Sequence, residues 1–82
     1  MFDCVILLTG PGEQAVLSAR LAECRPGLAV LPAASKADLL SVDRRTLARC
    51  RLIAFTTSVV VPGSVLDGLG YGGYNFHPGP PE

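Results

Sequence analysis

The chain has 82 residues, of which 49% are hydrophobic and 17% charged, and its seven basic and seven acidic residues cancel. This balance leaves no basic patch, so we expect no nucleic-acid partner. The mean hydropathy of +0.40 is high for so small a domain and predicts apolar surface that more chain or a partner would cover. The apolar run at residues 4–8 is too short for a signal peptide or a membrane span, so we expect a cytoplasmic protein that does not bind membranes.

The cysteines Cys4, Cys24 and Cys50 are spread along the chain without a CxxC pair. Each lies beside an apolar segment, which is typical of reduced, buried thiols in a cytosolic protein. His77 is the single histidine, and one histidine with scattered cysteines does not form a metal-ligand set. We therefore expect reduced thiols and no metal cofactor.

The first third of the chain predicts a strand, a helix and a second strand. Residues 2–9 should form a strand that is covered on both faces, because residues 4–8 are continuously apolar instead of alternating. Residues 13–24 should form a helix, since apolar residues recur at i, i+4 and i+7 along one face. Residues 28–31 predict a second short strand, which Pro32 should end.

The middle of the chain offers two helix starts, because the stretches 35–38 and 41–43 both fit a capping pattern. We expect a loop to about Leu40 and a helix over residues 42–50. One longer helix is the alternative. The arginines of this region should form the solvated face of that helix, namely Arg44, Arg45, Arg49 and Arg51.

The last third predicts a third buried strand at residues 52–55, a short helix at 64–69 and a fourth strand at 74–76. Strands and helices then alternate along the whole chain. This alternation is typical of an open parallel sheet. We therefore expect one α/β domain over residues 1–82, with a Rossmann-like sheet of about four strands.

One candidate for chemistry is the turn between the first strand and the first helix. Residues 10–15 match the pattern G-x-G-x-x-A of dinucleotide-binding turns, in which a pyrophosphate rests on the helix N-terminus. Glu13, however, places a negative charge where the pyrophosphate would lie. The second strand also carries no acid at its tip to bind a ribose hydroxyl. A nucleotide-binding module therefore stays an alternative interpretation.

The second candidate is the pair Asn75 and His77 at the carboxyl end of the fourth strand, where open parallel sheets bind ligands. Two residues apart, the side chains should point to the same side of an extended backbone. An asparagine amide can donate a hydrogen bond to a developing oxyanion, and a histidine can transfer a proton near neutral pH. Pro78 favours extended geometry at His77. The pair therefore predicts chemistry on a carbonyl group.

These residues resemble a known family. The run 75–78, Asn-Phe-His-Pro, follows a glycine-rich segment and resembles the Asn-x-His motif of 10-formyltetrahydrofolate-dependent formyltransferases. Residues 51–62 and the pair 65–66 are similar to that family's third strand, cofactor loop and short helix. The resemblance covers the whole chain in element order and is specific from about Leu52 to Pro81.

The resemblance implies the N-terminal half of a formyltransferase domain that transfers a formyl group from 10-formyltetrahydrofolate, the cosubstrate, to an amine acceptor. Asn75 would hold the formyl oxygen, and His77 would polarise the formyl group or move a proton. The pterin side of the folate pocket would be lined by the backbone of four residues, namely Thr57, Ser58, Val59 and Val60.

The sequence departs from the family after the motif. Residues 79–82 are Gly-Pro-Pro-Glu, where the family commonly has a serine, two leucines and a proline. The family's catalytic aspartate lies well downstream of the histidine, and neither Asp38 nor Asp67 matches it. We therefore expect a part of a formyltransferase that is inactive alone. A third interpretation is a non-catalytic α/β module that associates with itself or a partner through its exposed sheet.

Overall fold

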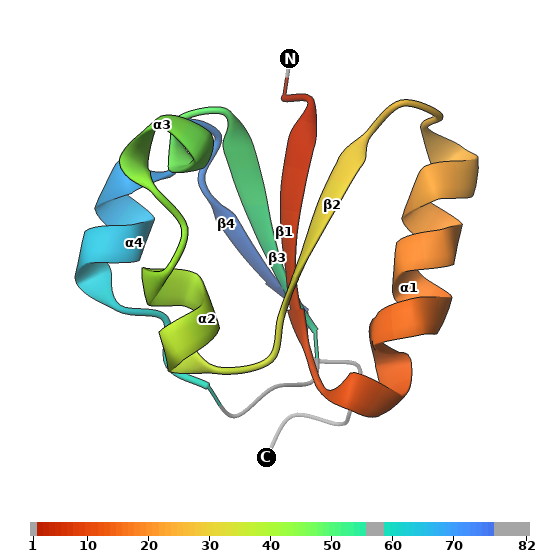
Figure 1. The fold of residues 1–82 in the computed structure, drawn as a ribbon, viewed down its shortest axis with the longest axis horizontal. Coiled ribbons are helices and arrows are strands. Elements are labelled where there is room, and N and C mark those ends of the chain that lie inside the picture. Colours follow the sequence, from red (N-terminus) through yellow and green to blue (C-terminus); the bar gives the residue numbers. More distant parts are fainter. Residues whose placement is uncertain (1, 56–58, 77–82) are drawn as a thin grey trace.

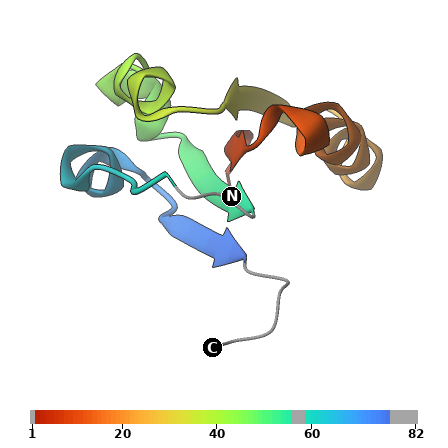
Figure 2. The same ribbon diagram turned by 90° about the horizontal axis from the view of Figure 1, so that it is seen from below.

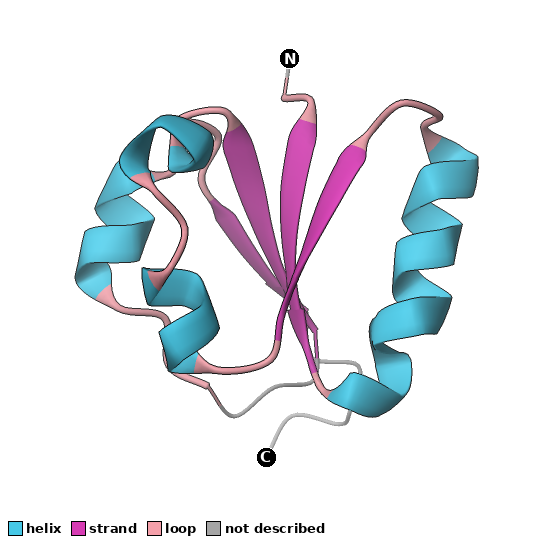
Figure 3. Cartoon of the chain, viewed as in Figure 1, coloured by secondary structure: helices cyan, strands magenta, loops and turns pink. Residues whose placement is uncertain are grey.

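A computed structural model describes residues 2–55 and 59–76 of the chain. It contains one sheet of four parallel strands in the order β2-β1-β3-β4 (Figure 1). The strands are β1 (Cys4–Thr9), β2 (Ala29–Ala33), β3 (Cys50–Phe55) and β4 (Gly73–Phe76). The helices are α1 (Pro11–Cys24), α2 (Lys36–Leu40), α3 (Arg44–Leu47) and α4 (Gly63–Gly68) (Figure 3). The expected Rossmann-like α/β fold is confirmed.

The helices lie on both faces of the sheet. Helix α1 packs beside β2 and β1 on one face, and α2, α3 and α4 lie on the other (Figures 1 and 2). Strand β1 is buried over its whole length, as its continuous apolar run predicted. The largest apolar cluster lies between the sheet and α2–α4, where Ile6, Leu39 and Leu52 are each at most 2% exposed.

Strand β2 contains Pro32 and runs to Ala33, so the prediction that Pro32 ends it was wrong. Pro32 pairs with Leu7 of β1. The physical reason is position: β2 is an edge strand, and a proline is tolerated there because one side of the strand has no neighbour to receive a backbone N–H.

The segment between β2 and β3 forms two short helices, where the sequence predicted a loop to about Leu40 and one helix over residues 42–50. The predicted loop was wrong, because residues 36–40 form α2. Both capping signals are used. The Ser35 hydroxyl accepts a hydrogen bond from the N–H of Asp38 at 3.2 Å, and the Asp43 carboxylate accepts one from the N–H of Thr46 at 2.8 Å. The bond from Thr46 lowers the pKa of Asp43, because it stabilises the charged carboxylate.

Strand β3 begins at Cys50, which extends it backwards into the predicted helix. Arg51 therefore belongs to a strand and is half-buried, whereas Arg44, Arg45 and Arg49 are exposed as expected. Helix α1 begins at Pro11, two residues before the predicted start, because proline fits the first helical position, where no N–H is needed.

Cys4 and Cys50 form a disulfide, so the expectation of reduced thiols was wrong for this pair. The two residues are direct partners on β1 and β3, with their Cα atoms 4.5 Å apart. Both side chains are buried in the core. A sequence separation of 46 hides such a pair from any spacing motif, and only the sheet register reveals it. Cys24 is free and exposed, which also departs from the expected burial.

Candidate functional site

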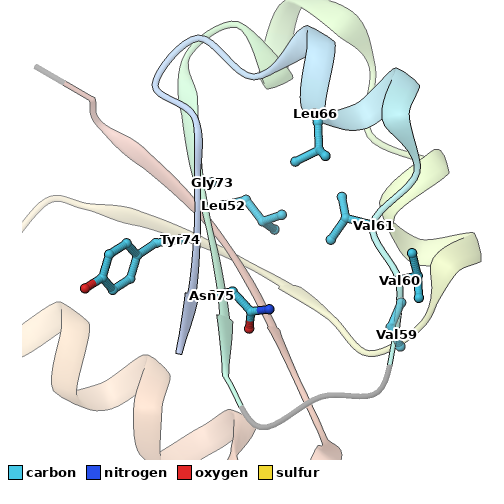
Figure 4. Close-up of a pocket in the computed structure, with 8 residues that line it drawn as sticks. All are labelled: Leu52, Val59, Val60, Val61, Leu66, Gly73, Tyr74 and Asn75. Carbon is cyan, nitrogen blue, oxygen red and sulfur yellow. The ribbon is translucent and has the colours of Figure 1, made fainter. Parts of the chain in front are cut away.

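A pocket of about 520 Å³ lies beside β4, the strand that carries Asn75 (Figure 4). Two strands and one loop supply most of its walls. The lining residues are Leu52, Val59, Val60, Val61, Leu66, Gly73, Tyr74 and Asn75. A volume in this range suits a small organic ligand.

The sheet register places Asn75 in this pocket. On β3, Leu52 and Ala54 point into the core, and they pair with Gly73 and Asn75 of β4. Successive side chains alternate between faces, so Asn75 extends from the same face of the sheet. Figure 4 shows its amide directed toward the loop at residues 59–61, whereas Tyr74 points away on the other side of the strand. The Asn75 side chain is exposed to solvent.

The far wall of the pocket is the extended segment Val59, Val60 and Val61. Val59 and Val61 are partly buried against the core cluster, which fixes the segment to the body of the domain. Val60 is 82% exposed. Leu66 of α4 closes a further side of the pocket (Figure 4). The result is an apolar wall opposite one amide.

Strand β4 is held in register by backbone hydrogen bonds to the segment that precedes β3 and to β3 itself. The N–H of Gly70 donates to the carbonyl of Leu47 at 3.0 Å, and the N–H of Tyr71 donates to Cys50 at 3.2 Å. Gly72 has a φ of 75°, a left-handed conformation that glycine adopts without strain, and its carbonyl accepts from Leu52. These bonds set where β4 begins and therefore where Asn75 lies.

Three of the six predicted site residues lie together in this pocket: Asn75, Val59 and Val60. The other three, Thr57, Ser58 and His77, lie outside the described residues. The other five lining residues were not predicted for the site: Leu52, Val61, Leu66, Gly73 and Tyr74. Strand alternation could have found Gly73, because it lies two residues before Asn75 on the same face.

The second sequence candidate, residues 10–15, forms the turn from β1 into α1. The Glu13 carboxylate folds back on this turn, since its Oε1 would lie 3.1 Å from a Cβ built on Gly10. The buried Thr9 hydroxyl beside the turn has no hydrogen-bond partner. A carboxylate at the helix N-terminus occupies the place of a pyrophosphate, which weakens the nucleotide-binding interpretation.

Within the described ranges, no cluster of three or more metal-ligating side chains occurs. No helix among the described residues is both long and apolar enough to cross a membrane.

The fold and the pocket define a small open parallel α/β domain with a ligand-sized hollow over β3 and β4, which extends from Gly73 at the amino end of β4 to Asn75 near its carboxyl end. Searches against family models, curated proteins and solved structures find no match for this chain.

Proposed function

We propose that this domain binds 10-formyltetrahydrofolate in the pocket beside β4 and serves formyl transfer to an amine. One observation carries the proposal: the fold brings Asn75 into the same pocket as Val59 and Val60. The sequence resemblance had given these residues separate roles, holding the formyl oxygen and lining the pterin site. Their meeting in one pocket supports that assignment.

The chemistry required of Asn75 suits its position. When an amine attacks the formyl carbon, a C–N bond forms and the carbonyl oxygen gains negative charge. A neutral amide N–H directed at that oxygen stabilises the charge. The bond from the formyl carbon to N10 then breaks, and the proton lost by the amine passes to the leaving nitrogen. The resemblance gives this proton transfer to His77.

The opposite wall fits the pterin end of the ligand. A pterin is a flat ring with donors and acceptors on its edge, so it needs apolar contact on its faces and backbone groups beside its rim. The segment Val59 to Val61 can offer both, because valine side chains alternate with backbone N–H and C=O groups along it. We place the pterin there and the formyl group at Asn75.

Ligand binding tests the proposal directly. The chain is titrated with a hydrolysis-resistant 10-formyl folate analogue and, in parallel, with NADH. We expect saturable binding of the folate alone. Asn75→Ala should weaken binding about tenfold, the size of one lost hydrogen bond to a polar ligand group. Val60→Asp should weaken it further, because it places a carboxylate in the apolar wall.

Val16→Asp is the matched control, since Val16 is also an exposed valine (65%) but lies on α1, away from the pocket. It should leave folate binding unchanged. Absence of folate binding, or equal losses from Val16→Asp and Val60→Asp, would overturn the proposal. Binding of NADH in place of the folate would favour the turn at residues 10–15.

A further inference from the structure

One half of a sheet face carries no helix among the described residues. Helix α1 covers β2 and β1, whereas α2–α4 cover the opposite face (Figure 2). Arg51 and Ile53 of β3 point to the α1 side, because Cys50, Leu52 and Ala54 alternate with them into the core. Parallel strands are normally buried on both faces. Among the described residues, the β3–β4 half of the α1 face is therefore uncovered, and we call it the open face.

The middle of the open face is apolar. Ile53 is half-buried, and Tyr74 on the neighbouring strand is 59% exposed. Ile53 and Tyr74 are direct partners in the register of β3 and β4, so their side chains stand side by side. Tyr74 points away from the pocket that Asn75 faces (Figure 4). Tyr74 is also a lining residue of the pocket, so the open face and the proposed folate site lie on opposite sides of the same strand.

The open face has the width of one helix. Neighbouring strands lie about 4.8 Å apart, so two strands occupy roughly 10 Å, the diameter of an α-helix with its side chains. Helix α1 illustrates the fit, since it covers the other two strands of the same face. A second helix could lie beside it in the same manner.

The amino end of the open face is positively charged. The guanidinium carbons of Arg51 and Arg25 lie 5.2 and 4.8 Å from the centre of the Phe2 ring. Both residues are half-buried. The Arg25 guanidinium already donates a hydrogen bond to the backbone carbonyl of Phe2, whereas the Arg51 Nε is buried without a hydrogen-bond partner. Within the described residues, the ion pair present is Arg49 with Asp3, so neither Arg25 nor Arg51 has a carboxylate partner. A buried donor such as the Arg51 Nε normally meets an acceptor.

The direction of a docked helix follows from α1. Helix α1 runs from the carboxyl end of β1 back to the amino end of β2, so its C-terminus lies at the same end as Arg51. A helix docked in that direction brings its own C-terminus to Arg51 and Arg25. The helix dipole makes this terminus negative, and acidic residues in the last turn add to the attraction.

We propose that the open face binds an amphipathic helix of a partner protein, antiparallel to the strands, with its apolar stripe on Ile53 and Tyr74 and a carboxylate of its last turn on Arg51. A second copy of the chain is a poorer occupant. A two-fold interface joins the same patch on both copies, and this patch offers arginines without a carboxylate.

A displayed library of 14-residue helices, the length of α1, tests the proposal. The library has a fixed apolar stripe and fully randomised first and last turns, and selection is made on the purified chain. We expect Asp and Glu to be enriched in the last turn and not in the first. Selection on Arg51→Gln should lose this enrichment, and Arg51→Lys should restore part of it. Arg20→Gln, which removes an exposed arginine of α1, should behave as the unmodified chain.

Individual selected peptides are then measured. Replacing the last-turn Glu by Gln should weaken binding about tenfold on the unmodified chain and not on Arg51→Gln, as for one charge-assisted hydrogen bond. Circular dichroism of Arg51→Gln checks that the variant is folded. The proposal is overturned if no acidic preference appears, if the preference persists on Arg51→Gln, or if sedimentation finds a dimer that Tyr74→Thr dissociates.

Discussion

Gly70 lies directly against the backbone carbonyl of Ala48, and a Cβ built on Gly70 would stand 1.7 Å from that oxygen. The adjacent N–H of Gly70 donates to the carbonyl of Leu47 at 3.0 Å. This contact joins the segment between α4 and β4 to the turn between α3 and β3. The position of β4, and with it Asn75, thus depends on a backbone contact that no side chain at residue 70 would permit.

Gly70→Ala should therefore lower the free energy of unfolding by at least about 2 kcal/mol, as for other overpacked sites. The cost arises because the backbone of either segment must move by more than an ångström. Urea unfolding followed by circular dichroism measures it. We expect folate-analogue binding to weaken as well, since the movement shifts β4.

Gly12→Ala is the matched control. A Cβ on Gly12 meets nothing within 4 Å, and the residue lies in the first turn of α1. Alanine should be neutral or stabilise by up to about 1 kcal/mol there, because it is a better helix former than glycine. Equal stability of the two variants would show that the close approach at Gly70 relaxes without cost.

The alternation of strands and helices could be predicted from the sequence because most elements are signalled locally. The continuous apolar run of β1 and the capping residue Asp43 are examples, whereas Ser35 caps a helix where a loop was expected. The wrong predictions concern features that depend on where a residue lies in the sheet. Pro32 continues a strand because β2 lies at an edge, and the Cys4–Cys50 pair follows from register. Neither fact is contained in a short window of sequence.

The Cys4–Cys50 disulfide should appear in thiol counts. The denatured, unreduced chain should show one reactive thiol, Cys24, and all its cysteines should react after reduction. Because the bond closes a loop across 46 residues, its removal in Cys4→Ala/Cys50→Ala should cost about 4 kcal/mol by the chain-entropy relation. Cys24→Ser should leave the unfolding midpoint unchanged.

Thiol counts on protein taken directly from cells also bear on the compartment. Disulfides persist in oxidising compartments and are rare in the cytosol. We expect the bonded form in freshly isolated protein if the chain resides in an oxidising compartment. A full set of free thiols there, with oxidation appearing only during purification, would instead support the cytoplasmic location that the sequence predicted.

Asp43 should add acid sensitivity to the domain. Its folded-state pKa lies below the ordinary value of 3.8, chiefly because the Thr46 N–H bonds to its carboxylate. A lowered folded pKa contributes stability that is fully present above the unfolded pKa and is lost as pH falls through the folded value. The Asp43 contribution should therefore be intact at neutral pH and disappear below about pH 4.

An NMR titration of the Asp43 carboxyl carbon checks the direction of this shift. Asp43→Asn keeps a capping oxygen and should reduce the loss of stability between pH 5 and pH 3, because asparagine does not titrate there. Asp67→Asn, at an exposed site in α4, serves as the control. A measured pKa of Asp43 at or above the ordinary carboxyl value would contradict the hydrogen bond from the Thr46 N–H.

Part of the candidate site could be predicted from the sequence, because strand geometry determines where Asn75 and the loop after β3 lie. Alternation on an extended strand gives the face of Asn75 once β4 is recognised, and the loop after β3 must pass near the end of β4 in a parallel sheet. Leu66 could not be found in this way. Its contact with the pocket depends on how α4 packs, and α4 is too short for its periodicity to indicate a face.

Asn75 and Tyr74 lie on opposite sides of one strand, so the two proposed sites should respond to separate mutations (Figure 4). Asn75→Ala should weaken folate-analogue binding and leave the selected helices unaffected. Tyr74→Thr should weaken binding of the selected helices and have a smaller effect on the folate analogue, because the Tyr74 ring points away from Asn75 although the residue lines the pocket. Threonine keeps the strand propensity of β4 and removes the aromatic ring from the open face. Calorimetric titration of each variant with both ligands gives four affinities. If both variants weakened the binding of both ligands equally, the two sides of β4 would not act independently. The interpretation that they form two separate sites would then be wrong.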